Sequence, residues 1–253
     1  MPRVMAIANQ KGGVAKTTSV HTLGIAAAER GARVLLVDLD PQACLTFSNG
    51  LDPDSLDQSM HDVMLGRATA RDVLVRVGEL DLLPSSIDLA GAEVNLLSRT
   101  GREYVLRRAL DPLLAEYDLV LIDCPPSLGI LTINGLTAAN EVLIPLQCET
   151  LGHRGVGQLL ETIDDVRSYT NAGLGVRGVI ATMFDSRTKL AQEMVLSVRT
   201  KFDLTVLDPP VPKSVKVAEA PGHGQSVLAH APGSKAADAY RCLAEQLVPA
   251  GAG

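Results

Sequence analysis

Short apolar runs alternate with segments of helical periodicity along most of the chain. The runs are rich in Val, Leu and Ile, and they favour buried strands, whereas the segments between them repeat apolar residues at helical spacing. The predicted strands are residues 3–8, 33–37, 80–83, 118–122, 142–146 and 176–182. The predicted helices are residues 16–30, 100–116, 128–139, 152–168, 188–201 and 234–248. Such alternation predicts an α/β fold built from βαβ units, with a mostly parallel twisted sheet and helices on both faces.

This pattern continues without an internal repeat or a long Pro/Gly linker, so we expect a single domain over residues 1–248. Residues 249–253 carry no apolar periodicity, and we expect them to form a flexible tail. Ligands of open α/β sheets bind at the carboxyl ends of the strands. The residues that directly follow the predicted strands are therefore the first place to look for chemistry.

Composition and charge narrow the class of protein. No apolar stretch approaches the roughly 18 residues of a membrane span, and the first strand begins too early to leave room for a signal peptide. The four cysteines lack metal-ligand spacing, which indicates reduced thiols and a cytoplasmic protein. Residues 1–150 hold 12 Lys and Arg against 19 Asp and Glu, and residues 151–253 hold 11 against 10. Any contact with nucleic acid must therefore use a local basic patch.

The first strand leads into a candidate phosphate loop, Asn9-Gln10-Lys11-Gly12-Gly13-Val14-Ala15-Lys16-Thr17-Thr18, and then into a predicted helix. A turn of this kind directs backbone N–H groups, together with the positive end of the helix dipole, toward an anion. Gly12 and Gly13 allow the main chain to curl around a phosphate. Lys16 would neutralise phosphate oxygens, Thr17 would offer a hydroxyl to Mg²⁺, and Thr18 could reach an inner phosphate.

The loop departs from the usual pattern G-x-x-x-x-G-K-[ST] at both glycine positions, which are Gln10 and Ala15 here. Ala15 adds a methyl group where glycine is usual, so we expect a negative φ at this residue. Taken by itself, the string is also compatible with an ordinary turn between a strand and a helix.

Two further predicted strands end in carboxylates on the same side of the sheet. Asp38 and Asp40 follow the second strand, and Asp123 ends the strand Leu119–Ile122. A carboxylate at the position of Asp123 holds Mg²⁺, often through water, and a second one orients or deprotonates the attacking water. We assign that second role to Asp40, and we expect Asp38 to shape the loop or to assist Mg²⁺ at longer range. Three such features in one chain indicate nucleotide binding.

With these residues, the sequence resembles the ParA/MinD family of ATPases, and nearly the whole chain takes part in the resemblance. Lys11–Thr18 is similar to the family's deviant Walker A motif, K-G-G-x-G-K-[ST]-T, and the segments around Asp38 and Asp123 resemble its second and third motifs. Residues 182–188 and 211–221 are similar to the ParA (Soj-like) subgroup. The resemblance implies a P-loop NTPase fold, with ATP and Mg²⁺ as cofactors.

The resemblance also implies roles for particular residues. Lys11 would reach across the interface of an ATP-bound homodimer to the partner's phosphates, so that Lys11, Lys16 and Asp40 carry hydrolysis. The nucleotide contacts would extend over the whole loop, including Val14 and Ala15. Pro212 would border the adenine together with Ser214, where the subgroup usually has Asn.

Branches of this family differ in what the dimer binds. The last predicted helix, residues 234–247, has two basic and two acidic residues and little bulky apolar area, which makes it a poor membrane anchor. Residues 187–216 hold six basic residues against three acidic ones, which favours salt-sensitive contacts to duplex DNA phosphates. The candidate DNA contacts are Arg187, Lys189, Lys213 and Lys216, of which the resemblance itself implies Arg187 and Lys216.

The most specific interpretation is a chromosome- or plasmid-partitioning ATPase. It would coat the nucleoid as a dimer, without sequence preference, and a ParB-type centromere-binding partner would accelerate its slow hydrolysis. Two alternatives remain open from the sequence. One is an ATPase of the same fold that positions a protein cargo, and the other is a P-loop ligase that uses ATP on a small metabolite.

Overall fold

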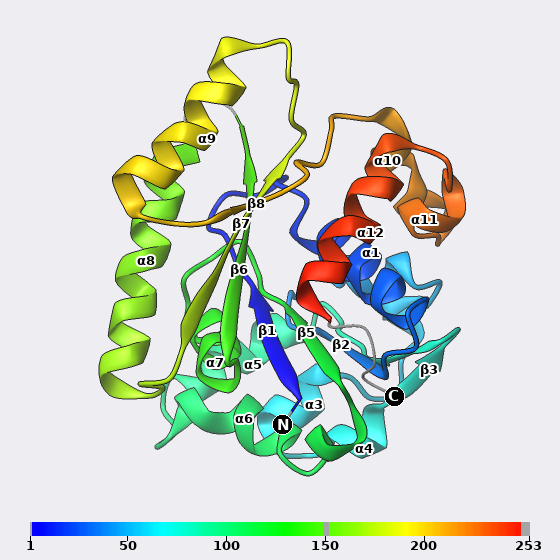
Figure 1. Cartoon of the computed structure of the whole chain (residues 1–253). Helices are drawn as coiled ribbons and strands as arrows, with labels where there is room; N and C mark the ends of the chain where they lie inside the picture. Colours follow the sequence, from blue (N-terminus) through cyan, green and yellow to red (C-terminus); the bar gives the residue numbers. More distant parts are fainter. Residues whose placement is uncertain (1, 149–151, 249–253) are drawn as a thin grey trace.

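An eight-stranded sheet runs through the middle of the fold, with strand order β3-β4-β2-β5-β1-β6-β7-β8 (Figure 1). All neighbouring strands are parallel except β3, which pairs antiparallel with β4. The computed structural model describes residues 2–148 and 152–248, so the predicted tail at 249–253 lies outside the described residues. The strands are β1 (Arg3–Ile7), β2 (Val34–Asp38), β3 (Val75–Val77), β4 (Leu80–Leu83), β5 (Leu119–Asp123), β6 (Glu141–Gln147), β7 (Gly175–Thr182) and β8 (Val206–Leu207).

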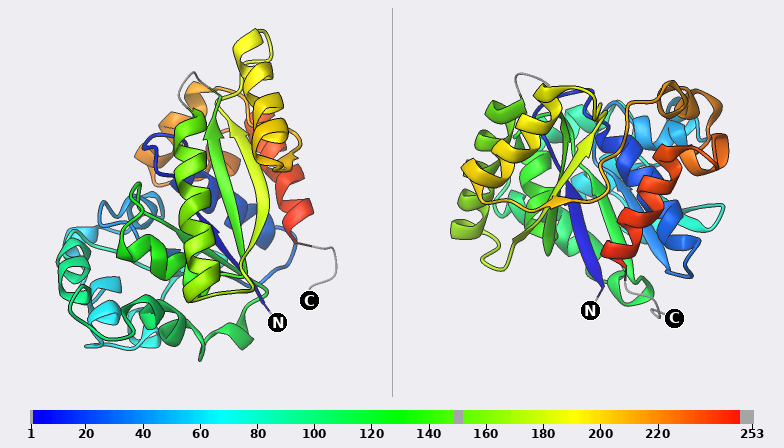
Figure 2. Two further views of the ribbon diagram at one scale, coloured as in Figure 1. Left: turned by 90° about the vertical axis from the view of Figure 1, so that its left-hand side faces the viewer. Right: turned by 45° about the horizontal axis from the view of Figure 1, so that its top comes forward.

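Helices cover both faces of this sheet (Figures 1 and 2). One apolar core joins the sheet to α3, α4, α5, α6, α7, α8 and α9, and the other joins it to α1, α11 and α12. The α-helices are α1 (Lys16–Ala28), α2 (Cys44–Ser48), α3 (Met60–Leu65), α4 (Ala70–Val73), α5 (Leu89–Leu96), α6 (Val105–Leu110), α7 (Ile130–Ala138), α8 (Gly152–Tyr169), α9 (Lys189–Phe202), α10 (Val215–Glu219), α11 (Val227–His230) and α12 (Lys235–Leu247). Short 3₁₀ turns lie at η1 (Pro53–Ser55), η2 (Arg102–Tyr104), η3 (Leu114–Glu116) and η4 (Ala220–His223). The predicted α/β architecture is confirmed.

All six predicted strands are present, within two residues of the expected bounds at each end. The sequence analysis missed β3, which is short and partly exposed, and β8, which has only two residues. It also missed the short helices between residues 44 and 96 and those between residues 215 and 230. No helix within the described part of the chain is both long and apolar enough to cross a membrane.

The continuous helix predicted over residues 100–116 was wrong, because this segment consists of η2, α6 and η3. Asn134, on the facing helix α7, replaces the backbone hydrogen bond that would join Leu106 to Arg102 in a continuous helix. Its side chain accepts a hydrogen bond from the N–H of Leu106 at 3.1 Å and donates one to the carbonyl oxygen of Arg102 at 2.8 Å. A buried side chain from another element thus satisfies the backbone groups that would otherwise pair within one helix.

Close packing between α1 and β2 sets the position of the helix that begins at Lys16. A Cβ atom added at Gly24 would lie 2.7 Å from Cδ2 of Leu36, which is completely buried. We therefore expect Gly24→Ala to lower the free energy of unfolding by about 1–2 kcal/mol, even though alanine favours helices.

Gly157→Ala in α8 is the matched control for this prediction, because the nearest atom to its added Cβ would be 3.9 Å away. That change should raise the free energy of unfolding by up to about 1 kcal/mol through helix propensity alone. Urea unfolding of both variants measures the two effects. Equal stabilisation by both substitutions would contradict tight packing at Gly24.

Candidate functional site

The pairing of the strands brings the predicted phosphate loop and the acidic residues together at the carboxyl ends of the strands. Asp123 at the end of β5 lies beside Asp38 at the end of β2 and beside Ile7 at the end of β1. The loop that follows β1 enters α1 at Lys16. Parallel pairing therefore brings together three segments that are each separated by at least 20 residues in sequence.

The backbone of the loop turns through two left-handed residues. Gly13 has a φ of 72°, which glycine adopts without strain, and Ala15 has a φ of 66°. The expectation of a negative φ at Ala15 was therefore wrong. Ala15 is the residue that immediately precedes α1, and the loop reverses direction there, so the turn imposes the left-handed conformation on a residue that disfavours it.

Lys16 begins α1 with its side chain directed back into the loop. It is only 6% exposed, and its Nζ donates a hydrogen bond to the carbonyl oxygen of Lys11 at 3.2 Å. Burial lowers the pKa of Lys16, while Asp123 and Asp40 oppose that shift. The ammonium group thus lies in a poorly solvated acidic setting, where an incoming phosphate would find strong electrostatic attraction.

Asp123 is the least satisfied polar group at this edge. It is 1% exposed, and neither carboxylate oxygen has a hydrogen-bond partner of ordinary geometry among the described residues. Burial raises the pKa of Asp123 well above its usual range and Asp38 adds to the shift, whereas the nearby Thr17 hydroxyl and Lys16 lower it. A buried carboxylate without partners beside a threonine hydroxyl is a donor set that suits Mg²⁺ or its bound water. Thr17 and Asp123 would hold the ion.

Asp38 holds the chain that follows β2. Its carboxylate accepts hydrogen bonds from the N–H and the hydroxyl of Thr46, at 2.8 and 2.7 Å, and from the N–H of Asp40 at 3.2 Å. Burial raises the pKa of Asp38 to about 7, although these hydrogen bonds oppose the shift. The hydrogen bonds correspond to the loop-shaping role that the sequence suggested. Thr46 had no sequence signal, because only the fold places it against Asp38.

Asp40 lies two residues after β2, close to Lys16 and Asp123. Its carboxylate accepts the N–H of Gln42 at 2.9 Å, and 9% of the residue remains exposed. Its negative charge acts on both Lys16 and Asp123, which places it near the phosphate loop. A carboxylate with partial solvent access at this point is suited to orienting a water molecule.

Two residues that the sequence analysis gave no role fix the loop to the sheet. Asn9 is 2% exposed; its side chain donates to the carbonyl oxygen of Pro145 at 2.7 Å and accepts the N–H of Lys11 at 3.0 Å. Thr182, at the end of β7, donates its hydroxyl to the carbonyl oxygen of Val14 at 3.0 Å. Thr182 belongs to a stretch that resembles a family motif, and Asn9 starts the candidate phosphate loop, two residues before such a stretch.

The predicted adenine contacts lie on a segment beside β7. Val211 donates its N–H to Ala181 at 2.8 Å, and Pro212 forms an isolated parallel bridge with Phe184. Ser214 is half-buried and directly precedes α10, where its side chain makes no capping hydrogen bond. The segment therefore lies next to Thr182 and the phosphate loop, and the adenine contact itself stays a prediction.

The candidate DNA contacts come from the loop after β7, the start of α9 and the segment around α10. Arg187 forms two hydrogen bonds to Asp185, at 2.9 and 2.8 Å, and with Lys213 contributing it lowers the pKa of Asp185 to about 2. Lys216 on α10 donates to Glu219 at 3.2 Å. Lys189 begins α9, which lies across the molecule from α10 (Figures 1 and 2). Lys213 acts on the same carboxylate as Arg187 and lies three residues before Lys216.

Comparison with known proteins gives a consistent family. A family model described as an AAA domain, AAA_31, matches residues 2–176. The sporulation initiation inhibitor protein Soj of Bacillus subtilis is 41% identical over 253 residues, which cover 99% of this chain and all of the relative. The chromosome-partitioning ATPase Soj of Treponema pallidum is 44% identical, with 98% of each chain covered. The chain belongs to the ParA/Soj family of P-loop ATPases.

Solved structures support the same assignment. A structure from Mycobacterium smegmatis, described as a cobyrinic acid a,c-diamide synthase with bound ADP and magnesium, is 54% identical and has a TM-score of 0.88. It matches 98% of this chain, which in turn covers 94% of it. The septum site-determining protein MinD of Pyrococcus horikoshii, complexed with Mg-ADP, is 26% identical with a TM-score of 0.78 and covers 98% of this chain, which covers 96% of it.

As a ParA/Soj-type ATPase, the chain uses ATP and Mg²⁺. When bound, the ion would neutralise charge on the phosphate oxygens. The chain's own groups would do the remaining work: the loop N–H groups cradle the phosphates, the ammonium of Lys16 binds phosphate oxygens, and Asp40 orients water for attack. Because the loop is fixed to three strands, these groups are already in place before the substrate arrives.

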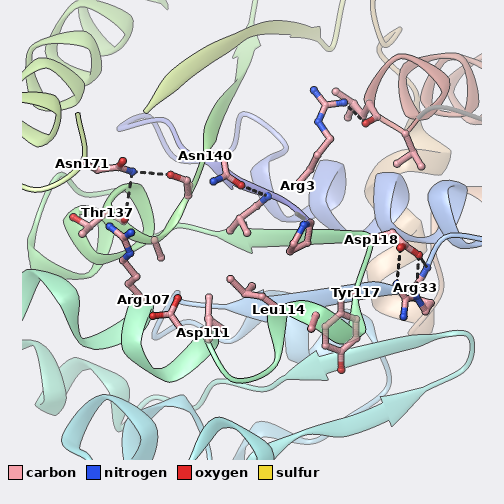
Figure 3. A pocket seen from close by; sticks show the side chains of 18 residues that line it. Arg3, Arg33, Arg107, Asp111, Leu114, Tyr117, Asp118, Thr137, Asn140 and Asn171 are labelled. Carbon is pink, nitrogen blue, oxygen red and sulfur yellow. Dashed lines mark hydrogen bonds and ion pairs between the residues drawn. The ribbon is translucent and has the colours of Figure 1, made fainter. Parts of the chain in front are cut away.

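A large cavity lies at the opposite end of the strands from this chemistry. It measures about 870 Å³ and is lined by residues at the amino ends of the strands, such as Arg3, Asp118 and Asn140 (Figure 3). Arg107 and Asp111 line one end of it, and Arg33, paired with Asp118, lies at the other (Figure 3). Size therefore does not identify the functional site here, whereas the convergence of buried charge does.

The left-handed conformation of Ala15 gives a stability prediction. Ala15→Gly should raise the free energy of unfolding by about 0.5–1 kcal/mol, because removing the Cβ relieves strain that outweighs the added freedom of the unfolded chain. Ala26→Gly, within α1, should lower it by about 1 kcal/mol or more. Urea titration of the nucleotide-free protein compares the two, and destabilisation by both substitutions would contradict strain at Ala15.

The unpartnered carboxylate of Asp123 gives a metal prediction. Asp123→Asn should raise the Mg²⁺ concentration for half-maximal ATP hydrolysis by about 10–100-fold, because the amide lacks the negative charge that attracts the ion or its water. Asp111→Asn, in the cavity at the opposite edge, should leave the Mg²⁺ dependence unchanged. Mg²⁺ titration of phosphate release measures this, and equal Mg²⁺ dependence in the two variants would contradict the assignment.

Proposed function

We propose that this chain is a DNA-partitioning ATPase whose ATP-bound dimer binds duplex DNA without sequence preference. The observation that carries the proposal is the loop with two lysines, Lys11 and Lys16, within a chain that aligns over nearly its full length with proteins named Soj and ParA. Slow hydrolysis would dissolve the dimer and release the DNA. This cycle would place the protein on the nucleoid for part of the time.

The different surroundings of the two lysines support the dimer. Lys16 is buried beside Asp40 and Asp123, so it serves the phosphates of its own subunit. Lys11 is only partly buried at the start of the loop, and its side chain donates a hydrogen bond to Gln147 at the end of β6. In a sandwich of two subunits, each Lys11 would supply positive charge to the partner's ATP, as an arginine finger does.

The distribution of charge supports DNA as the surface that the dimer binds. The chain carries a formal net charge of −6, so attraction to DNA must come from local groups such as Arg187 and Lys216. Each is paired with a neighbouring carboxylate, Asp185 or Glu219, which weakens its attraction for phosphate in a single subunit. A dimer would double the number of cations on the DNA-facing side and thereby make affinity depend on ATP.

A ParB-type protein is the partner that completes this proposed cycle. It would mark the DNA cargo and accelerate hydrolysis, so that repeated release and rebinding move a chromosome origin or a plasmid. An ATPase of the same fold that positions a protein cargo would share every residue discussed so far. A neighbouring gene for ParB would favour the first function over the second.

The 54% identical structure named as a cobyrinic acid a,c-diamide synthase favours a second candidate, an ATP-dependent amide-forming enzyme. Such a reaction needs an acceptor pocket beside the terminal phosphate. The 870 Å³ cavity begins at Arg3, whereas the phosphate loop follows Ile7, so the length of β1 separates them by about 13 Å or more. This cavity is therefore not the acceptor pocket of such an enzyme.

DNA binding tests the proposal. With ATP and Mg²⁺ at low salt, the wild type should bind duplex DNA at least tenfold more tightly than with ADP or without nucleotide, and the affinity should fall steeply as salt rises. Lys11→Ala should abolish the ATP dependence, Lys216→Ala should weaken binding with the dimer intact, and Asp40→Ala should prolong binding because hydrolysis stalls. Fluorescence anisotropy and sedimentation measure binding and dimerisation.

Lys235→Ala is the matched control for Lys216→Ala, because Lys235 is an exposed lysine at the start of a different helix, α12. Its substitution should leave DNA affinity unchanged. If the ATP-bound dimer forms but binds no DNA, the partitioning function is wrong. ATP turnover that requires a carboxylic acid acceptor and an amine would instead identify the ligase.

A further inference from the structure

The two lysines of the phosphate loop belong to one chain of hydrogen bonds that includes Gln147. The Nζ of Lys16 donates to the carbonyl oxygen of Lys11 at 3.2 Å, and the Nζ of Lys11 donates to Oε1 of Gln147 at 3.1 Å. Gln147 is the last residue of β6, the strand beside β1. Without nucleotide, the ammonium of Lys11 is therefore held by its own subunit.

The main chain of Lys11 is fixed at the same end of β6. Asn9 is almost completely buried and links the N–H of Lys11 to the carbonyl oxygen of Pro145, two residues before Gln147. Gly155 of α8 adds to this restraint, because a Cβ there would lie 3.2 Å from the Asn9 oxygen. With the backbone fixed, a change in the reach of Lys11 must come from its side chain, and Gln147 restrains that side chain.

ATP would first disrupt the hydrogen bond between the ammonium of Lys16 and the carbonyl oxygen of Lys11. Phosphate oxygens compete with the carbonyl oxygen of Lys11 for the ammonium of Lys16, and a charged acceptor binds an ammonium more strongly than a neutral one does. The hydrogen bond from Lys11 to Gln147 would persist until a stronger acceptor approaches the ammonium of Lys11. In the proposed dimer, that acceptor is the partner's phosphate.

We propose that Gln147 is a positioning residue that holds Lys11 in its own subunit and thereby sets the protein concentration at which the ATP-bound dimer forms. The inference rests on the proposed function, because it uses the transfer of Lys11 to the partner's nucleotide. Each subunit has to break one Lys11–Gln147 hydrogen bond, so the dimerisation equilibrium contains this contact twice. A neutral amide is suited to the task, since it holds the ammonium less firmly than a carboxylate would.

Two substitutions of similar length should shift dimerisation in opposite directions. Gln147→Met removes the acceptor and should lower the dimer Kd by about 10-fold or more. Gln147→Glu replaces the amide with a carboxylate, which holds Lys11 more firmly, and should raise the dimer Kd by about 10-fold. Sedimentation of each variant with Mg²⁺ and a non-hydrolysable ATP analogue, over a range of protein concentrations, measures the dimer Kd.

Nucleotide affinity separates this role from a general structural effect. The Kd of the analogue, measured at protein concentrations where all variants are monomeric, should change less than about twofold, since Lys16 binds the nucleotide within the subunit. Gln158→Met and Gln158→Glu make the same chemical changes at an exposed position of α8, and neither should shift the dimer Kd.

The outcomes distinguish this inference from the function on which it rests. Opposite shifts for Gln147→Met and Gln147→Glu, with nucleotide affinity retained, support the positioning role. If the wild type dimerises but the two variants shift together or not at all, the role of Gln147 is wrong and the dimer stands. If the wild type stays monomeric with the analogue at every concentration, both the dimer and this inference are overturned.

Discussion

Three ionisable groups, Lys16, Asp38 and Asp123, lie buried together at the carboxyl edge of the sheet, and the organisation of the site follows from this arrangement. Two carboxylates end neighbouring strands in register, and the charge of Asp38 adds to burial in making Asp123 harder to ionise. Asp38 is compensated by Thr46 and the backbone of Asp40, whereas Asp123 has no such hydrogen bonds among the described residues. That difference separates a carboxylate that builds the loop from one that is available to a metal ion.

The phosphate loop is rigid because several strands hold it at once. Asn9 links it to β6, Thr182 links it to β7, and the loop itself connects β1 with α1. These restraints keep Ala15 in a backbone conformation that alanine disfavours. Preorganisation of this kind reduces the ordering that nucleotide binding would otherwise require. Within such a loop, long side chains such as Lys11 are the parts that retain freedom to change partners.

The contrast between the two edges of the sheet bears on function. The amino ends of the strands hold the 870 Å³ cavity, yet Arg3 and Arg33 there are paired with Glu141 and Asp118. The carboxyl edge has the less satisfied charges, at Asp123 and Lys16. Perturbed buried groups of this kind are typical of functional sites, which agrees with the use of ATP and Mg²⁺ by this family.

The sequence by itself determined the sheet, the order of its main elements and the residues at its carboxyl edge. Continuous apolar runs identify buried strands, and aspartates at the ends of those runs must reach the ligand side of a parallel sheet. The marginal elements were missed for a physical reason. β3 and β8 are too short to show periodicity, and the break between Arg102 and Leu106 depends on Asn134 from another helix.

Only the tertiary structure decided how the site is held. The sign of φ at Ala15 follows from the path that the loop takes between β1 and α1, which local residue preference does not reveal. Thr46 and Gln147 acquire roles because folding places them beside Asp38 and Lys11, from distant or otherwise unmarked positions. Sequence patterns record what a residue does with its near neighbours, whereas hydrogen bonds across a sheet depend on which strands are adjacent.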